Sequence, residues 1–322
     1  MDSAQAAFLG YVVMGGDGLL SYWNEVVSDG LTYSVDMVTL RGSFPSMVMD
    51  DWTLPWSMSI KFLDAFVSRL HYFERLGHWD SQHFDSFSFL SYRDMWTVTT
   101  STGVAKFFFG FQGYQDDARD LWKIQFNPNK LLPNDGLVSL VRWVCDVSKK
   151  SSPPSIASVD VAVDFACARS YAFMVKDERK YQLVMNSTED KTEYLGCRGK
   201  MGFCKLYNKS LEAQLPEPLT RFEITLDLGD GMCVCDLNRL RRLVPIVWVL
   251  RDQLTLDASM ISGSDLVILR HCLQYPDALS LLGRRKKQKV SELISRLAGK
   301  LDLDFMIWVK QIYDLRELLL FG

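Results

Sequence analysis

Two segments of the chain, at residues 158–165 and 221–228, alternate strictly between apolar and polar side chains. A period of two is typical of a β-strand that packs one face on a core and keeps the other face polar. The polar face of the first segment carries Asp160 and Asp164, and that of the second carries Glu223. If the strands are neighbours, these carboxylates converge on one sheet surface. Such oxygen ligands suit Mg²⁺ or Mn²⁺, although a half-exposed sheet face also carries charge without any function.

The rest of the chain reads as strands first and helices later. Further strands are predicted over 33–40, 87–100, 105–112, 121–126, near Tyr194 and over 203–209. Apolar residues three and four apart predict helices over 57–76, 137–147, 236–250, 263–275, 290–301 and 304–320. We therefore expect an α+β fold, with a mostly antiparallel sheet, flanking helices and a helical C-terminal region. The triplet Ser-Val-Asp occurs at 34–36 and again at 158–160, as two similar half-domains would give.

Length and composition set the organisation that we expect. The 322 residues are enough for two domains, which we assign as an α+β domain at 31–235 and a helical region at 236–322, preceded by a lead-in at 1–30. The N-terminus lacks a signal-peptide pattern, and apolar runs are too short to span a membrane. Seven cysteines, an odd number, suggest reduced thiols. These features predict a cytoplasmic protein with no membrane partner.

Positive charge is concentrated between residues 191 and 221. This segment has six basic and three acidic residues, whereas the whole chain has a net charge of −3. Its glycine-rich turn at 196–202 would let a backbone approach a phosphate. No Walker A pattern occurs, which argues against ATP hydrolysis, and no paired histidine or cysteine motif indicates a metal site of that kind. Nucleic acid is therefore the anionic partner that this segment suggests.

Several motifs follow one another in a recognisable order. They are Val-Asp-Val-Ala-Val-Asp at 159–164, Tyr-Leu-Gly-Cys-Arg at 194–198, Tyr-Asn-Lys at 207–209 and Arg-Phe-Glu at 221–223. This order resembles the replication initiation factor family, which contains rolling-circle initiators of small plasmids and related relaxases of conjugative elements. The resemblance is clearest over residues 156–228. The strand at 33–36 is also similar to the first strand of that family.

The resemblance implies a reaction and a set of site residues. A tyrosine nicks one DNA strand at an origin, becomes linked to the 5′-phosphate, and later allows the ends to be rejoined without ATP. Here that nucleophile is Tyr194, with Arg198 as a second catalytic residue. Asp160 and Glu223 correspond to metal ligands, with Asp164 as a third candidate, for Mg²⁺ or Mn²⁺. A phenol has a pKa near 10, so a nearby cation would help it to act as a nucleophile. Strand separation would need a host helicase.

Basic residues in two regions are candidate DNA contacts, and each candidate has an alternative. The set is Lys200, Lys205, Lys209, Arg221, Arg284, Arg285, Lys286 and Lys287. Tyr194 could instead be a packed aromatic residue, with Tyr207 as the rival nucleophile. The lysines could form a solvated strand face, and Arg221 could pair with a carboxylate. The basic run at 284–289 could be a solvated helix end, and the last helices could pack on the main domain or form a homodimer contact.

The sequence also departs from the family pattern. Ser158 occupies a position where arginine is common, and Cys197 and Gly199 lie in a turn that usually carries serine. The acidic balance of the chain is unusual for an initiator. Three functions therefore remain open: a replication initiator, a conjugative relaxase with the same chemistry, and a non-catalytic DNA-binding regulator on the same scaffold.

Overall fold

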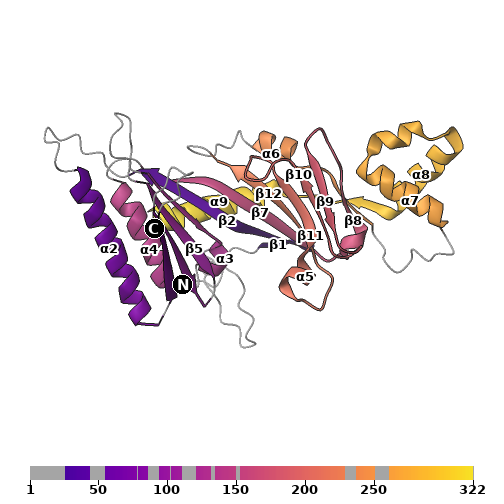
Figure 1. Ribbon diagram of the computed structural model, residues 1–322. Helices are drawn as coiled ribbons and strands as arrows, with labels where there is room; N and C mark the ends of the chain where they lie inside the picture. Colours follow the sequence, from indigo (N-terminus) through magenta and orange to yellow (C-terminus); the bar gives the residue numbers. More distant parts are fainter. Residues whose placement is uncertain are drawn as a thin grey trace, which may run out of the picture.

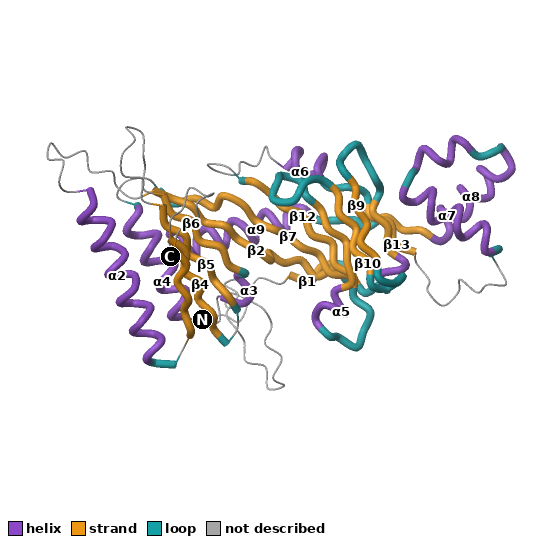
Figure 2. Tube along the Cα trace, in the orientation of Figure 1, coloured by secondary structure: helices purple, strands orange, loops and turns teal. Residues whose placement is uncertain are grey.

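The computed structural model describes residues 26–43, 55–77, 79–85, 94–101, 103–110, 121–131, 135–149, 153–228, 237–250 and 261–321. Its fold is α+β, as predicted, and is built on a large antiparallel sheet with helices along one face (Figures 1 and 2). Within these ranges, no helix has the length and apolar character that a membrane crossing requires. Most of the lead-in predicted at 1–30 lies outside the described residues.

The large sheet consists of two halves with the same connectivity. The first half contains β2 (Leu31–Ser43), β3 (Trp79–Asp85), β4 (Asp94–Thr100), β5 (Val104–Gly110) and β6 (Leu121–Phe126), and β1 (Val26–Ser28) pairs with β2. The second half contains β7 (Ser155–Phe165), β9 (Tyr181–Met185), β10 (Lys191–Leu195), β11 (Cys204–Asn208) and β12 (Thr220–Asp227). The order β3-β4-β5-β6-β2-β7-β12-β11-β10-β9 joins the halves through β2 and β7. In each half, the strand that meets the other half pairs with the last strand of its own half: β2 pairs with β6, and β7 with β12.

A β-bulge in β2 keeps one face of the central strands apolar. The register with β7 shifts between Val35 and Met37, so one extra residue is inserted there. Because of this insertion, Tyr33 and Val35 before the bulge and Val38 after it all belong to the core. The inserted segment contains Asp36, which lies on the opposite, polar face near the second half-sheet.

Three helices cover the apolar face of the sheet. They are α2 (Pro55–Arg75), α4 (Asp135–Ser148) and α9 (Phe305–Arg316). Phe66 of α2 packs edge-on against Phe109 at 4.9 Å between ring centroids. Trp308 of α9 contacts Tyr33 and donates a hydrogen bond to the Ala162 carbonyl at 3.0 Å. The C-terminal helix α9 therefore belongs to the core of the main sheet, and the polar face of the second half stays available for a site.

The C-terminal region contains strands as well as helices, which corrects part of the prediction. The helix predicted at 236–250 is α6 (Leu237–Leu243) followed by β13 (Val247–Leu250), because Pro245 cannot continue a helix. The helix predicted at 290–301 is α8 (Arg284–Leu297) followed by β14 (Ala298–Lys300), which pairs with β13. The strand β8 (Ala172–Met174) completes this small sheet. The helix α7 (Gly263–Gln274) and the 3-10 turn Pro276–Leu281 precede α8 at the far end of the molecule (Figure 1).

The remaining elements of the described residues are short. They are α3 (Pro128–Leu131), α5 (Lys209–Ala213), the 3-10 turn Arg169–Tyr171 and the π-turn Glu317–Phe321. The strands β3 and β9 were not predicted. They are the two edge strands in the order of the large sheet. An edge strand buries less of its surface, so the alternation of apolar and polar residues along its sequence is weak. Of the strand predicted at 87–100, only the part from Asp94 onward lies within the described residues.

Candidate active site

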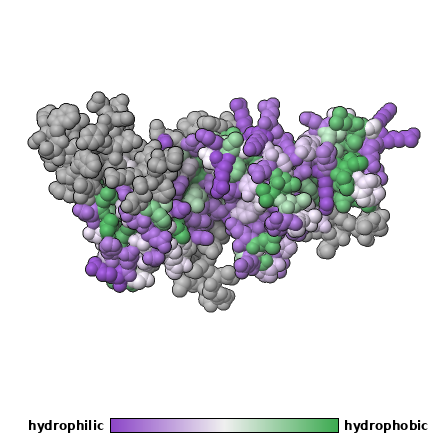
Figure 3. Space-filling model, in the orientation of Figure 1, coloured by the Kyte–Doolittle hydropathy of each residue, from purple (hydrophilic) through white to green (hydrophobic). Residues whose placement is uncertain are grey.

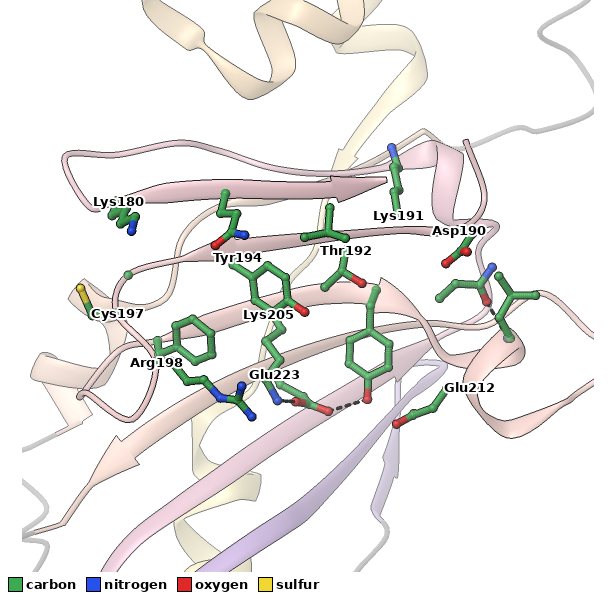
Figure 4. Close-up of a pocket in the computed structure, with 17 residues that line it drawn as sticks. Lys180, Asp190, Lys191, Thr192, Tyr194, Cys197, Arg198, Lys205, Glu212 and Glu223 are labelled. Atoms are coloured by element: carbon green, nitrogen blue, oxygen red, sulfur yellow. Dashed lines mark hydrogen bonds and ion pairs between the residues drawn. The ribbon is translucent and has the colours of Figure 1, made fainter. Parts of the chain in front are cut away.

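The polar face of the second half-sheet carries a pocket of about 900 Å³ (Figure 4). Three neighbouring strands supply its central side chains. The register places Tyr194 of β10 opposite Lys205 of β11, and Lys205 opposite Glu223 of β12. A phenol, an ammonium group and a carboxylate therefore stand in a row across the sheet. Further lining residues include Lys180, Gln182, Thr192, Arg198, Tyr207 and Glu212.

The turn between β10 and β11 depends on glycines with left-handed backbone angles. Gly196 has φ +96° and Gly202 has φ +78°, which other residues adopt at a cost. A Cβ atom added to Gly202 would also lie 3.0 Å from the Leu243 side chain. This compact turn brings the exposed Arg198 to the rim of the pocket, where its guanidinium points toward the same space as Lys205 (Figure 4).

Tyr194 is held by packing while its ring remains half-buried. The ring stacks on Phe203 with centroids 5.8 Å apart and planes 12° from parallel. The neighbouring Lys205 stays charged. Burial lowers the pKa of Lys205, but the neighbouring Glu223, Asp160 and Tyr194 raise it more. The pKa of Lys205 is therefore above the ordinary lysine value. Lys205 is therefore a permanent positive charge on the strand next to Tyr194.

Both oxygens of Glu223 are already hydrogen-bonded. The Lys205 Nζ atom donates to Oε2 at 2.6 Å, and the Tyr207 hydroxyl donates to Oε1 at 2.5 Å (Figure 4). Glu223 is 6% exposed. Burial and the negative charge of Glu223 raise the pKa of Tyr207 far above its ordinary value. Tyr207 is therefore a neutral hydrogen-bond donor that orients Glu223.

Arg221 and Asp164 hold each other on the same polar face. The guanidinium donates to the two Asp164 oxygens at 2.6 and 2.5 Å, and its third nitrogen donates to Asp36 from the β2 bulge. Arg221 is only 5% exposed. The predicted DNA contact Arg221 and the predicted third metal ligand Asp164 thus form one buried ion-pair cluster. Asp36 was not predicted as a site residue, although the repeated Ser-Val-Asp triplet contains it.

Asp160 and Glu223 are the two carboxylates that lie near Lys205. Burial raises the pKa of Asp160 and the charge of Glu223 adds to this effect, while a hydrogen bond from Thr225 and the charge of Lys205 oppose it. Within the described residues, no group of three or more histidine, cysteine, aspartate or glutamate side chains is arranged to hold a metal. Two carboxylates still fit a cation such as Mg²⁺, which often takes one or two of them and completes its shell with water and substrate phosphates. In this structure the Lys205 ammonium is bound to one of these two carboxylates, Glu223, at 2.6 Å.

A fully buried ion pair lies directly behind Tyr194, and sequence reasoning missed it. Glu193 faces the opposite side of β10 and accepts a hydrogen bond from Arg169 Nη2 at 2.7 Å, and both side chains are 0% exposed. Arg169 also donates to the carbonyls of Leu206 and Ala172. Nearby, burial and the charge of Arg169 lower the pKa of Lys191 to about 8. No local sequence signal marks such a pair, because its partners come from separate elements.

The other predicted DNA contacts lie in different surroundings. Lys200 is exposed in the β10–β11 turn, and Lys209 pairs with Glu212 at 2.6 Å. At the start of α8, Arg284, Arg285 and Lys287 are exposed. Lys286 and Lys289 bind the Asp265 carboxylate of α7 at 2.5 and 2.6 Å. Hydrophilic side chains project from this end of the molecule in Figure 3.

Among known proteins, the similarity of this chain is to solved structures and not to sequence families. No protein-family pattern matches the sequence, and no curated protein is significantly similar to it. Among solved structures, the chain is similar to the rolling circle replication initiator protein from Geobacillus stearothermophilus. The TM-score is 0.37 and the sequence identity is 12%, over 82% of this chain and 97% of that chain. At this level of similarity no residue role can be transferred, so the roles of the site residues rest on their own geometry.

Proposed function

We propose that this protein is a DNA strand-nicking and strand-joining enzyme that initiates rolling-circle replication, with Tyr194 as its nucleophile. One observation carries the proposal. The half-buried Tyr194 phenol lies in a pocket beside the Lys205 ammonium and the Arg198 guanidinium, with the carboxylates of Glu223 and Asp160 on the adjoining strands. A phenol, fixed cations and carboxylates are the groups that phosphodiester transfer needs. The motif resemblance at 156–228 agrees with this chemistry.

In the proposed reaction, the Tyr194 oxygen attacks a DNA phosphorus and the bond to the 3′-oxygen breaks. The phenol proton leaves Tyr194, the 3′-oxygen departs as a hydroxyl, and the 5′-phosphate remains bonded to the tyrosine. The charges of Lys205 and Arg198 stabilise the phosphate oxygens as negative charge develops. Asp160 and Glu223 would hold Mg²⁺ or Mn²⁺, which when bound supplies further charge stabilisation. Attack by a 3′-hydroxyl on the phosphotyrosine reverses these steps and reseals the strand.

A nicking assay tests this function. The protein is incubated with Mn²⁺ or Mg²⁺ and a supercoiled copy of its own replicon, and the products are separated after detergent treatment. We expect a nicked circle with protein attached to the 5′ end. Tight DNA binding by folded protein without nicking on any candidate origin would contradict the enzyme proposal and favour the non-catalytic regulator.

The proposal implies particular partners. They are origin DNA, a host helicase with the replication machinery, and a second copy of the chain in a homodimer, all in the cytoplasm. A conjugative relaxase would use the same site. Genomic neighbourhood separates the two, since an initiator belongs to a small replicon and a relaxase lies beside transfer genes.

We also propose that the start of α8 grips duplex DNA through its exposed cations. Removing Arg284, Arg285 and Lys287 together, each by alanine, is expected to weaken DNA binding and to lower the slope of log affinity against log salt by about 0.9 per lost phosphate contact. Fluorescence anisotropy over a salt series measures both effects. Lys286→Ala is the matched control, because its ammonium binds Asp265 within the protein. An unchanged salt slope in the triple variant would show that α8 is a solvated helix end.

A further inference from the structure

We propose that Lys205 is a built-in competitor for the divalent cation, so that a metal enters the site only by displacing the Lys205 ammonium from Glu223. This inference rests on the proposed function, because it assigns Asp160 and Glu223 to the cation. The observation behind it is the position of the Lys205 Nζ atom, 2.6 Å from Glu223 Oε2. The Glu223 side chain is 8% exposed and that of Lys205 is 32% exposed, so the ammonium reaches inward from a more open position.

The charges on this face explain why Lys205 is the exchangeable cation. All three guanidinium nitrogens of Arg221 donate hydrogen bonds to carboxylates, two to Asp164 and one to Asp36. The 5% exposure of Arg221 leaves it little room to move. Asp160 and Glu223 remain, and the positive charge of Lys205 acts on both carboxylates. A single ammonium neutralises half of their charge, whereas a divalent cation neutralises all of it.

Displacement of Lys205 would also change the surroundings of Tyr194. Lys205 is the cross-strand partner of Tyr194, and its long, flexible side chain can turn from one strand neighbour toward the other. Once a metal occupies the carboxylates, the freed ammonium lies beside the phenol and the incoming phosphate. Metal binding then prepares the nucleophile, and the site without metal keeps its cation on Glu223.

Mn²⁺ binding without DNA tests this inference independently of nicking. Isothermal titration calorimetry compares the full-length protein with Lys205→Met, which keeps the aliphatic stem and removes the charge. We expect Lys205→Met to bind Mn²⁺ about tenfold more tightly, equivalent to about 1.4 kcal/mol. Lys209→Met is the matched control, because Lys209 pairs with Glu212 instead. Lys205→Arg restores the charge and is expected to bind Mn²⁺ no more tightly than the unmodified protein.

Two further variants localise the effect and guard against misfolding. Adding Glu223→Gln to Lys205→Met should abolish the gain in affinity, and a retained gain would place the cation elsewhere and overturn the inference. Lys205→Gln replaces Lys205→Met if circular dichroism shows that the methionine variant does not fold. The inference is also overturned if the folded neutral variant binds Mn²⁺ with an affinity within about twofold of that of the unmodified protein. It is overturned as well if neither protein binds Mn²⁺. If Lys205→Met binds Mn²⁺ more tightly but the unmodified protein nicks no origin, this inference stands and the proposed function is rejected. If the unmodified protein nicks its origin but Lys205→Met binds Mn²⁺ with unchanged affinity, the proposed function stands and this inference is rejected.

Discussion

Tyr194→Phe is expected to abolish both nicking and covalent attachment of the protein to DNA, by about 10⁴-fold or more, because removal of a nucleophile leaves only binding and electrostatic effects. The substitution deletes one oxygen and keeps the ring that stacks on Phe203. DNA affinity and the melting temperature should therefore remain close to those of the unmodified protein. Detergent-stable protein–DNA adducts on a gel, measured with a supercoiled replicon, check this expectation.

Tyr207→Phe is the control for Tyr194→Phe, since both tyrosines line the same pocket. The hydroxyl of Tyr207 is bound to Glu223 at 2.5 Å, and its burial and this negative neighbour raise its pKa, so it loses its proton with more difficulty than a free phenol. We expect Tyr207→Phe to form the adduct at a reduced rate, because one hydrogen bond that orients Glu223 is lost. Adducts that persist in Tyr194→Phe and vanish in Tyr207→Phe would reverse the two assignments.

Sequence periodicity could predict the strands that face both a core and a polar surface. The segments at 158–165 and 221–228 became β7 and β12, adjacent and antiparallel, because strict alternation leaves a strand little choice of face. The same reasoning gave a wrong prediction at 247–250, where a helix was expected and the structure has the strand β13. It is short and apolar, and such a run fits a buried strand or a helix equally well until Pro245 and the partners β8 and β14 are considered.

The candidate site was predictable in its residue types but not in its pairings. Tyr194, Glu223 and Asp160 could be selected from their motifs, and the structure places all three on one sheet face. Whether Lys205 contacts phosphate or Glu223 depends on strand register, which one sequence does not specify. Asp36 reaches the site because it lies at the bulge in β2. Its partner Arg221 is 185 residues away in the sequence, and no local pattern indicates such a contact.

Glu193→Ala is expected to lower the free energy of unfolding by about 3–5 kcal/mol, because it leaves the Arg169 charge buried without its partner. Both side chains are 0% exposed, and Glu193 also accepts hydrogen bonds from the Met174 amide and from Gln274 of α7, both at 3.3 Å. Urea unfolding followed by circular dichroism measures the loss. Glu212→Ala is the control, because that carboxylate belongs to an exposed pair whose contribution is about 0–1 kcal/mol. Equal losses in the two variants would contradict the importance of burial.

The same pair links the stability of the fold to the position of the nucleophile. Consecutive residues of β10 point to opposite faces, so Glu193 secures the strand from behind while Tyr194 faces the pocket. Glu193→Ala is therefore expected to reduce nicking by displacing Tyr194, although Glu193 itself is buried behind the pocket. A double variant, Glu193→Leu with Arg169→Met, removes both buried charges and should recover part of the stability and of the nicking together. Recovery is partial because two backbone carbonyls lose Arg169 as their donor. Recovery of stability without recovery of nicking would show that the ion pair acts on the site through its charge, and not through the position of β10.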